Sequence, residues 1–291
     1  MLLSTTNEGS KRRFVWDQKE PMASYLAIVH VGRWEEETLK AGKGIPIRLY
    51  TTAKTPSQTL AAFRKTPEML AAFEKFAGPY PFRSYGSVVI DDPELYYSLE
   101  TQSISTFRSG IGEATVAHEL AHQWFGDSVT IAEWRDLWLA EGFATYFEYL
   151  WIFRDDQKAF NAALRQLYRD TKKAGIGPAV VSEPEEIFEP NTYDRGALTL
   201  HSLRLRVGDD RFFDILRTWH KRYRGGNATS ADFIKLAVQV SKDQGVRDLL
   251  EAWLYDEEIP PLSGPEAALA ASEADQTALR HDAADSRRRA R

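Results

Sequence analysis

The sequence predicts an α+β fold in which a mainly β first part is followed by a helical second part. The first hundred or so residues contain short apolar runs and alternating patterns typical of strands, with one helical stretch among them. After Gly112 the apolar residues recur at helical spacing. The 291 residues are 43% hydrophobic, which is enough for one large core or two unequal ones. We therefore expect a small β lobe followed by a helical lobe.

Four stretches of the first part have the character of strands. Residues 25–29 form an uninterrupted apolar run, which predicts a buried strand at the edge of the fold, although its length also fits a helix. Apolar residues alternate with polar residues or proline over 45–49. Residues 88–90 predict a short buried strand, and 96–107, rich in Tyr, Ser, Thr and Ile, predict a half-exposed one.

One helix is expected within the first part and seven in the second. Helical spacing covers 55–76, and Gly78 and Pro79 stop that helix. A capping signature at 229–232 marks the start of one of the later helices. The seven helical patterns of the second part lie at about 113–125, 136–153, 157–173, 192–207, 210–223, 230–241 and 246–255.

Composition excludes several classes of function. The sequence has no cysteine, so a metal would have to be bound by His, Asp or Glu. The 37 basic and 42 acidic residues are spread along the chain, without the basic stripe that nucleic-acid binding requires. No apolar run approaches a membrane span, and the first residues do not resemble a signal peptide. We expect a cytoplasmic location, although a targeting segment upstream of this sequence would escape the argument.

The strongest chemical signal is an H-E-x-x-H pattern formed by His118, Glu119 and His122. Residues four apart share one face of a helix, so both imidazoles can bind one ion while Glu119 lies beside it. Because the pattern arises by chance in roughly one such chain in a hundred, it does not establish a site alone. Eighteen residues separate His122 from Glu141, which lies on a second apolar helix and supplies a third ligand.

Two histidines and a carboxylate are the three protein ligands of a catalytic zinc centre, with a fourth position left for water. The set His118, His122 and Glu141 therefore predicts one zinc ion, with Glu119 as general base rather than ligand. Thr145 and Glu148 lie near the face of Glu141 on its helix, and either is a candidate to orient a ligand histidine. For Glu148, a solvated helix carboxylate is an equally good interpretation.

These residues resemble the gluzincin aminopeptidases of the aminopeptidase N family. The resemblance covers roughly residues 15–260 and is carried by four segments. One departure is Ala140, where the family more often has Asn. The four segments are HELAHQWFGD at 118–127, WLAEGFATY at 138–146, GPYPF at 78–82 and YDRG at 193–196.

The resemblance implies a thermolysin-like metallopeptidase catalytic domain. Its small β lobe would carry Glu100, its helical lobe Tyr193, and the zinc helix would lie between them. Tyr193 would donate a hydrogen bond to the developing oxyanion, and Glu100 would pair with the free α-ammonium of a peptide substrate. In the segment around Glu100, Tyr97 and Thr101 replace the Gly and Asn of the family pattern.

The resemblance also divides the chain into three parts. Residues 1–42 are expected to be the remnant of an N-terminal β domain, and 43–262 the zinc catalytic domain. Residues 263–291 are rich in Ala, Asp, Glu, Ser and Arg and are expected to be a disordered tail. We expect the chain to be truncated, with apolar surface exposed where a partner domain would pack.

The function implied is that of a zinc-dependent aminopeptidase, which hydrolyses N-terminal residues from peptides through a zinc-activated water. A thermolysin-like endopeptidase shares the zinc chemistry, but it has no use for an amine-binding carboxylate at Glu100. A zinc-binding fragment without catalytic activity is the other alternative. Glu119 and Tyr193 argue against such a fragment, because neither residue is needed merely to bind zinc.

Overall fold

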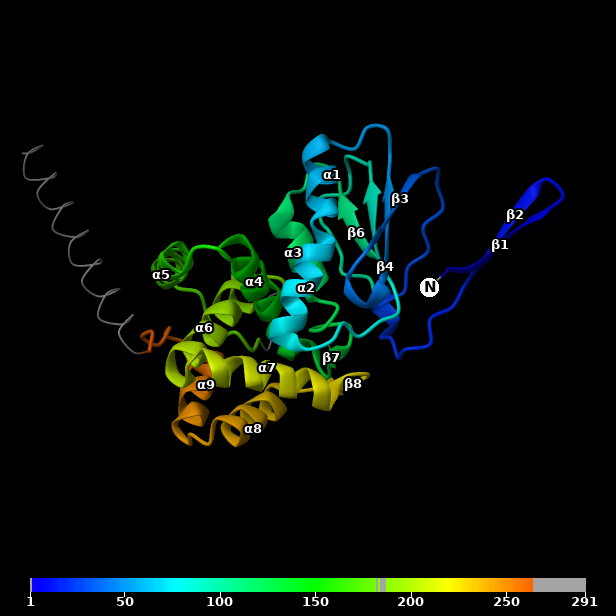
Figure 1. Ribbon diagram of the computed structural model, residues 1–291. Helices are drawn as coiled ribbons and strands as arrows, with labels where there is room; N and C mark the ends of the chain where they lie inside the picture. Colours follow the sequence, from blue (N-terminus) through cyan, green and yellow to red (C-terminus); the bar gives the residue numbers. More distant parts are fainter. Residues whose placement is uncertain (1, 182, 184–186, 264–291) are drawn as a thin grey trace, which may run out of the picture.

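The computed structural model describes residues 2–181, 183 and 187–263, and these have mixed α and β structure (Figure 1). A four-stranded sheet lies on one side of the molecule, with the first three helices against it and the other helices beyond them. The expected mixed α and β content is confirmed, with most strands in the first part of the chain and most helices in the second. Most of the predicted tail at 263–291 falls outside the described residues.

The sheet has the strand order β3-β4-β5-β6. Strand β3 (Glu35–Lys40) pairs antiparallel with β4 (Pro46–Thr51), whereas β5 (Tyr85–Ile90) is parallel to both β4 and β6 (Ser105–Arg108). Central β5 is buried over nearly its whole length, as a strand covered on both faces must be. The strands predicted at 45–49 and 88–90 are confirmed as parts of β4 and β5.

Two of the predicted strands are wrong. Residues 25–29 form no strand, because the chain makes a short 3₁₀ turn at Ser24–Leu26 and then leaves Val29 86% exposed. Of 96–107, only the end becomes β6, preceded by a single bridge between Leu99 and Thr106. Outside β6 and the bridge at Leu99, the β-forming residues of these two stretches have no neighbouring strand to pair with in the part of the chain that the structure describes, and composition alone does not reveal this.

Several of the strands are missing from the sequence prediction. A hairpin of β1 (Leu2–Glu8) and β2 (Lys11–Trp16) extends away from the rest of the molecule in Figure 1. Strands β7 (Val129–Ile131) and β8 (Gly226–Ala228) form a small parallel pair.

The helix predicted at 55–76 is divided into α1 (Ser57–Arg64) and α2 (Thr66–Ala77). Pro67 lies in the first turn of α2, where its missing N–H is not needed, so the chain restarts a helix there instead of continuing α1. Gly78, with φ of 91°, ends α2 as predicted.

Each of the seven helices predicted in the second part is present. A π-helical turn, η5 (Asn191–Arg195), occupies the start of the pattern predicted at 192–207. The seven are α3 (Glu113–Ala121), α4 (Trp138–Ile152), α5 (Gln157–Ala174), α6 (Gly196–Val207), α7 (Asp209–Tyr223), α8 (Ser230–Ser241) and α9 (Gly245–Tyr255).

One hydrophobic core joins the sheet to the helical part, and α4 crosses it. Aromatic contacts link α2 to α4 through Phe73 and Phe147, whose ring centroids are 5.0 Å apart. Phe125 and Phe143 lie 4.6 Å apart between the end of α3 and α4. Aromatic packing of this kind contributes to stability beyond the buried area alone, and it stabilises the packing of α4 against α3 and the residues that follow it.

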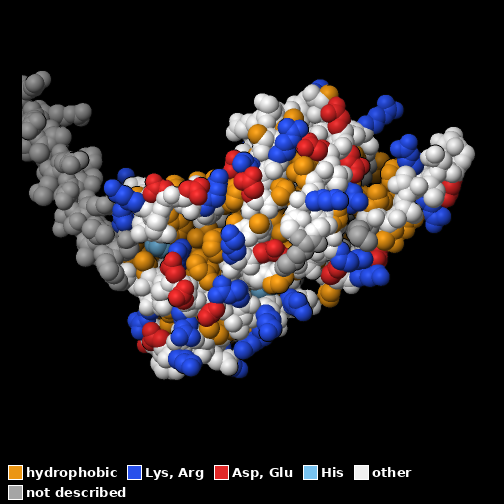
Figure 2. Space-filling view, in the orientation of Figure 1, with side chains coloured by type: hydrophobic (Ala, Val, Ile, Leu, Met, Phe, Trp, Pro, Cys, Tyr) orange, Lys and Arg blue, Asp and Glu red, His pale blue; other side chains and the backbone are white. Residues whose placement is uncertain are grey.

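The surface carries both signs of charge. On the face shown in Figure 2, basic and acidic side chains are intermixed. Among the helices described, none combines the length and the apolar character that crossing a membrane would require.

Candidate metal centre and active site

The candidate metal ligands come from α3 and α4, which pack side by side in the core. His118 lies in the last turn of α3 and His122 immediately follows the helix, while Glu141 lies in the first turn of α4. Glu141 Oε2 is 3.2 Å from His118 Nε2 and 3.3 Å from His122 Nε2. The structure therefore brings together the three residues that the sequence predicted as ligands.

This donor set fits a zinc ion. One ring nitrogen of each histidine and one carboxylate oxygen all lie within 4.8 Å of one another, in a site that is largely buried. Zinc takes such nitrogen and oxygen ligands in tetrahedral geometry, and three protein ligands leave its fourth position open. A closed structural site would need a fourth protein ligand.

Neighbouring groups orient both ligand histidines. His122 Nδ1 donates a hydrogen bond to the backbone carbonyl of Phe125 at 3.0 Å, which leaves the Nε2 lone pair of the neutral ring directed at the ligand cluster. His118 Nδ1 lies 3.5 Å from Glu148 Oε2, in the position predicted for an orienting carboxylate. Among the hydrogen bonds of the described residues, none joins buried Thr145 to a histidine.

Glu119 lies beside the ligands and is buried. Its carboxylate, that of Glu100 and a ring nitrogen of His122 lie within 4.8 Å of one another. Burial raises the pKa of Glu119 to about 8, and repulsion from Glu100 and Glu141 adds to the effect of burial. A carboxylate with a pKa near neutrality is suited to accept and later return a proton.

Tyr193 is brought to the same place by the π-helical turn η5. Its ring stacks on that of His118, with centroids 6.2 Å apart and an interplanar angle of 17°. Burial raises the pKa of Tyr193 above its ordinary value, and the nearby carboxylates of Glu141 and Glu100 raise it further. The phenol is therefore protonated at neutral pH and available as a hydrogen-bond donor.

Glu100 lies in the segment that leads into β6, at the edge of the sheet nearest α3. Its backbone is fixed on both sides, by the bridge between Leu99 and Thr106 and by a 2.9 Å hydrogen bond from Gln123 Nε2 to the Glu100 carbonyl. Only 7% of Glu100 is exposed. The predicted site residue from the β part is therefore next to the predicted residues from α3.

Two further polar groups near these carboxylates had no predicted role. Both carboxylate oxygens of buried Asp127 and the hydroxyl of Tyr25 have no hydrogen-bond partner among the described residues. Burial raises the pKa of Asp127 well above its ordinary value, with Glu100 and Glu119 adding repulsion. Asp127 is the last residue of the segment HELAHQWFGD at 118–127, so the family resemblance could have indicated that it lies near the site. Tyr25 lies in the stretch wrongly predicted as a strand, where its hydroxyl gave no signal.

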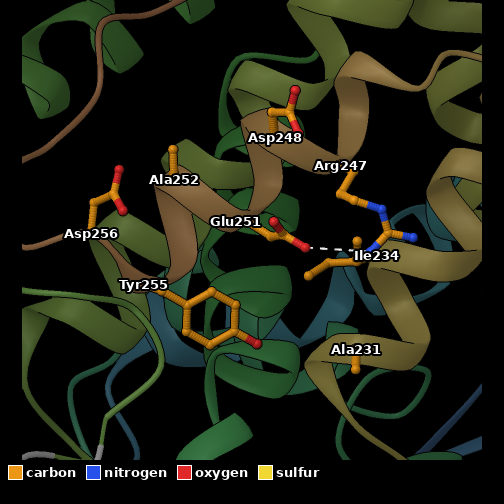
Figure 3. A pocket seen from close by; sticks show the side chains of 8 residues that line it. All are labelled: Ala231, Ile234, Arg247, Asp248, Glu251, Ala252, Tyr255 and Asp256. Carbon is orange, nitrogen blue, oxygen red and sulfur yellow. Dashed lines mark hydrogen bonds and ion pairs between the residues drawn. The ribbon is translucent and has the colours of Figure 1, made fainter.

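A separate groove of about 530 Å³ lies between α8 and α9 (Figure 3). Arg247 and Glu251, which both line the groove from α9, form an ion pair at 3.3 Å. None of the residues that line it belongs to the metal centre.

Comparison with known proteins gives consistent matches. The family described as the peptidase family M1 domain matches residues 61–253. Aminopeptidase M1-C of Oryza sativa subsp. japonica is 28% identical over 285 residues, covering 89% of this chain and 32% of the relative. Glutamyl aminopeptidase of Bos taurus is 27% identical over 281 residues, covering 86% of this chain and 29% of the relative. The chain thus spans about a third of the length of these curated relatives.

Solved structures match the fold as well. An M1 zinc metallopeptidase from Deinococcus radiodurans superimposes with a TM-score of 0.83 and 32% identity, covering 91% of this chain and 62% of that one. A mutant M1 zinc metallopeptidase from the same organism, bound to a Tyr-Ser-Ala substrate, matches with the same TM-score and 31% identity.

Proposed function

The chain belongs to peptidase family M1, and on that premise we propose that it is the zinc-dependent catalytic part of an aminopeptidase. The observation that carries the proposal is the convergence of Glu100, Glu119 and Tyr193 on the cluster of His118, His122 and Glu141. Binding a metal requires only the cluster. Glu119 and the phenol of Tyr193 are groups that peptide hydrolysis requires, and Glu100 is the group that binding a free amino terminus requires.

We also propose a thermolysin-like arrangement of the site. The β part contributes Glu100, the helical part contributes Tyr193 from η5, and α3 lies between them with Glu119. A substrate would lie at this junction, where the two parts of the molecule meet.

In the proposed mechanism, His118, His122 and Glu141 would hold a zinc ion, which would supply a Lewis acid able to polarise the scissile carbonyl and to lower the pKa of water. The carboxylate of Glu119 accepts a proton from the attacking water and transfers it to the leaving amine. The Tyr193 hydroxyl donates a hydrogen bond to the carbonyl oxygen as negative charge develops there. A donor of this kind typically contributes about 2.7 to 4 kcal/mol to transition-state stabilisation.

Glu100 would select the end of the peptide. Its buried carboxylate can pair with the free α-ammonium of the first residue, and a charge pair in a partly desolvated site is stronger than one in water. This pairing would place the first peptide bond between Glu119 and Tyr193. Relatives named aminopeptidases and a relative bound to a tripeptide substrate support this assignment.

The test compares one peptide with a free amino terminus and with an acetylated one, after zinc analysis of the purified protein. We expect release of the first residue from the free peptide only. Glu119→Gln should retain zinc and lose about 10²- to 10⁴-fold in kcat, the usual contribution of a general base. Exposed Glu94 supplies the matched control, because Glu94→Gln should behave like the wild type.

Each alternative predicts a different result in the same assay. Equal cleavage of the acetylated peptide would indicate an endopeptidase and refute the role of Glu100. Stoichiometric zinc without any cleavage would indicate a zinc-binding fragment. Cleavage unaffected by Glu119→Gln would refute the mechanism.

A further inference from the structure

The helix that carries Glu141 and the turn that carries Tyr193 touch backbone to backbone. A Cβ built on Gly142 would lie 2.7 Å from Cα of Gly196 and 2.8 Å from its carbonyl carbon. A Cβ built on Gly196 would lie 2.8 Å from Cα of Gly142. Real Cβ atoms essentially never approach other atoms this closely. Only glycine at both positions permits α4 and the start of α6 to come this near.

This contact is adjacent to both functional groups. Gly142 follows Glu141 directly in α4, and Gly196 is three residues beyond Tyr193, at the point where η5 becomes α6. The glycine contact therefore lies between the helix that carries the ligand Glu141 and the turn that carries Tyr193.

The other side of the same turn is fixed by Arg195. Its side chain is completely buried, and its guanidinium donates hydrogen bonds to backbone carbonyls, including that of Trp253 at 2.8 Å. Helix C-termini leave carbonyls without partners inside the helix, and here a cation satisfies them. The carbonyls contacted belong to Ile176, Ala252, Trp253, Asp256, Glu257 and Glu258.

We propose that Gly142, Gly196 and Arg195 are positioning residues for Tyr193, which hold its phenol at the correct distance from the metal ligands. The glycine contact sets how closely η5 approaches α4, and Arg195 ties η5 to the end of α9. The inference rests on the proposed function of Tyr193 as an oxyanion donor. It extends that function by naming the groups that place the donor.

A methyl group at Gly196 must separate the two backbones, because the nearest atom it meets, Cα of Gly142 at 2.8 Å, belongs to the main chain of a packed helix. A displacement of about 1 Å at a catalytic group can cost about 10²-fold in rate. Gly196→Ala should therefore lower kcat about 10²-fold while KM changes less than about two-fold, since the donor acts mainly in the transition state. Zinc content should stay at the wild-type level, because His118 and His122 lie outside the contact and α4, which carries Glu141, is packed into the core, so that we expect the displacement to fall on η5. Loss of zinc would show that Glu141 had moved instead, and would overturn the proposal.

A double-mutant cycle with Tyr193→Phe separates positioning from general damage. If Gly196→Ala acts through Tyr193, adding it to Tyr193→Phe should cause almost no further loss of kcat. Gly42→Ala is the matched control, because a Cβ there meets nothing within 4 Å, and it should be neutral. An equal loss of kcat in both backgrounds, or a kcat unchanged by Gly196→Ala, would overturn the proposal.

A second measurement does not depend on activity. With 3-fluorotyrosine incorporated, the ¹⁹F signal of Tyr193 is the one lost in Tyr193→Phe, and we expect Gly196→Ala to shift it while Gly42→Ala does not. An unshifted signal would contradict the proposal. If the wild type proved inactive on peptides, the proposed function would fail, and the ¹⁹F result would still decide the positioning.

Arg195→Lys provides a variant for the case that Gly196→Ala does not fold. Lysine keeps the charge but cannot reach carbonyls from several segments as the planar guanidinium does. We expect kcat to fall about ten-fold with KM nearly unchanged, together with a shift of the same ¹⁹F signal. Wild-type kcat in Arg195→Lys would exclude its part in positioning Tyr193.

Discussion

His118 has a carboxylate near each of its ring nitrogens. Nε2 faces Glu141, which His122 shares, whereas Nδ1 faces Glu148, which His118 does not share with His122. With a metal at the ligand cluster, the Nδ1–H would donate to Glu148 and fix both the tautomer and the plane of the ring. Such an outer carboxylate also makes the ligand nitrogen more basic.

Glu148→Ala should therefore weaken zinc binding about 10- to 100-fold, the range measured for outer partners of metal ligands. Competition with a chromophoric chelator gives the affinity directly. Glu148→Gln retains an acceptor oxygen and should retain most of the affinity. If Glu148→Ala bound zinc as tightly as the wild type, the carboxylate would be a solvated helix residue, which the sequence alone allowed.

A site residue could be predicted from spacing alone only where its partners are close to it in the sequence. His118, Glu119 and His122 are one helical turn apart, so spacing alone placed them together. Glu100 and Tyr193 had to be located by family resemblance, because strand and helix patterns do not encode which distant segments meet. Tyr25 was missed for the same reason. Its ring lies 5.2 Å from that of Trp134, more than a hundred residues away in the sequence.

Among the elements, α8 shows most directly how a short sequence signal becomes a helix end. Thr229 accepts a hydrogen bond from the backbone N–H of Asp232, and the Asp232 carboxylate accepts one from the N–H of Thr229. These reciprocal bonds satisfy two N–H groups that the first turn leaves without partners. The helix begins at Ser230, as the signature at 229–232 predicted.

Thr229→Ala should lower the free energy of unfolding by about 1 kcal/mol, since it removes the acceptor of the capping box. Chemical denaturation of the zinc-loaded protein measures the change. Thr229→Ser keeps the hydroxyl and should remain within about 0.5 kcal/mol of the wild type. Equal stability of all three proteins would mean that packing of α8, and not its cap, determines where the helix starts.

Helices were predicted more completely than strands because their hydrogen bonds are local. The polar strands β1 and β2 have no buried face, so no alternation marks them. Strands β7 and β8 are three residues each and exist only as a pair, from segments almost a hundred residues apart. In 55–76 the helical period was correct, but the pattern does not show that Pro67 starts a new helix.

At the scale of the whole molecule, the candidate site joins segments from nearly the full length of the described chain. Four buried carboxylates, those of Glu100, Glu119, Asp127 and Glu141, lie near only two histidines. Burying this much negative charge is costly unless cations compensate it. In the metal-free protein, protonation of the carboxylates and histidines compensates this negative charge. Zinc binding and pH should therefore affect the stability of the fold through the same side chains.

The pKa shifts predict whether the stability of the metal-free protein rises or falls with pH. Burial lowers the pKa of His122, but the carboxylates of Glu141 and Glu100 outweigh burial and raise it from 6.5 to about 9. A histidine with a raised pKa stabilises the fold fully below pH 6.5, and this contribution is lost as the pH rises through about 9. Glu119, with its pKa raised to about 8, binds a proton more tightly when folded and acts in the same direction.

Zinc binds the neutral imidazoles, so its affinity rises over the same range in which the metal-free protein loses stability. The difference in Tm between zinc-loaded and chelator-treated protein should therefore widen from pH 6.5 to pH 9. Thermal unfolding at several pH values and constant free zinc measures it. His122→Gln removes both the ligand and the titrating ring, and its two forms should unfold at nearly the same temperature throughout. A Tm difference in the wild type that is constant or narrows with rising pH would show that these buried groups do not govern the coupling of metal binding to folding.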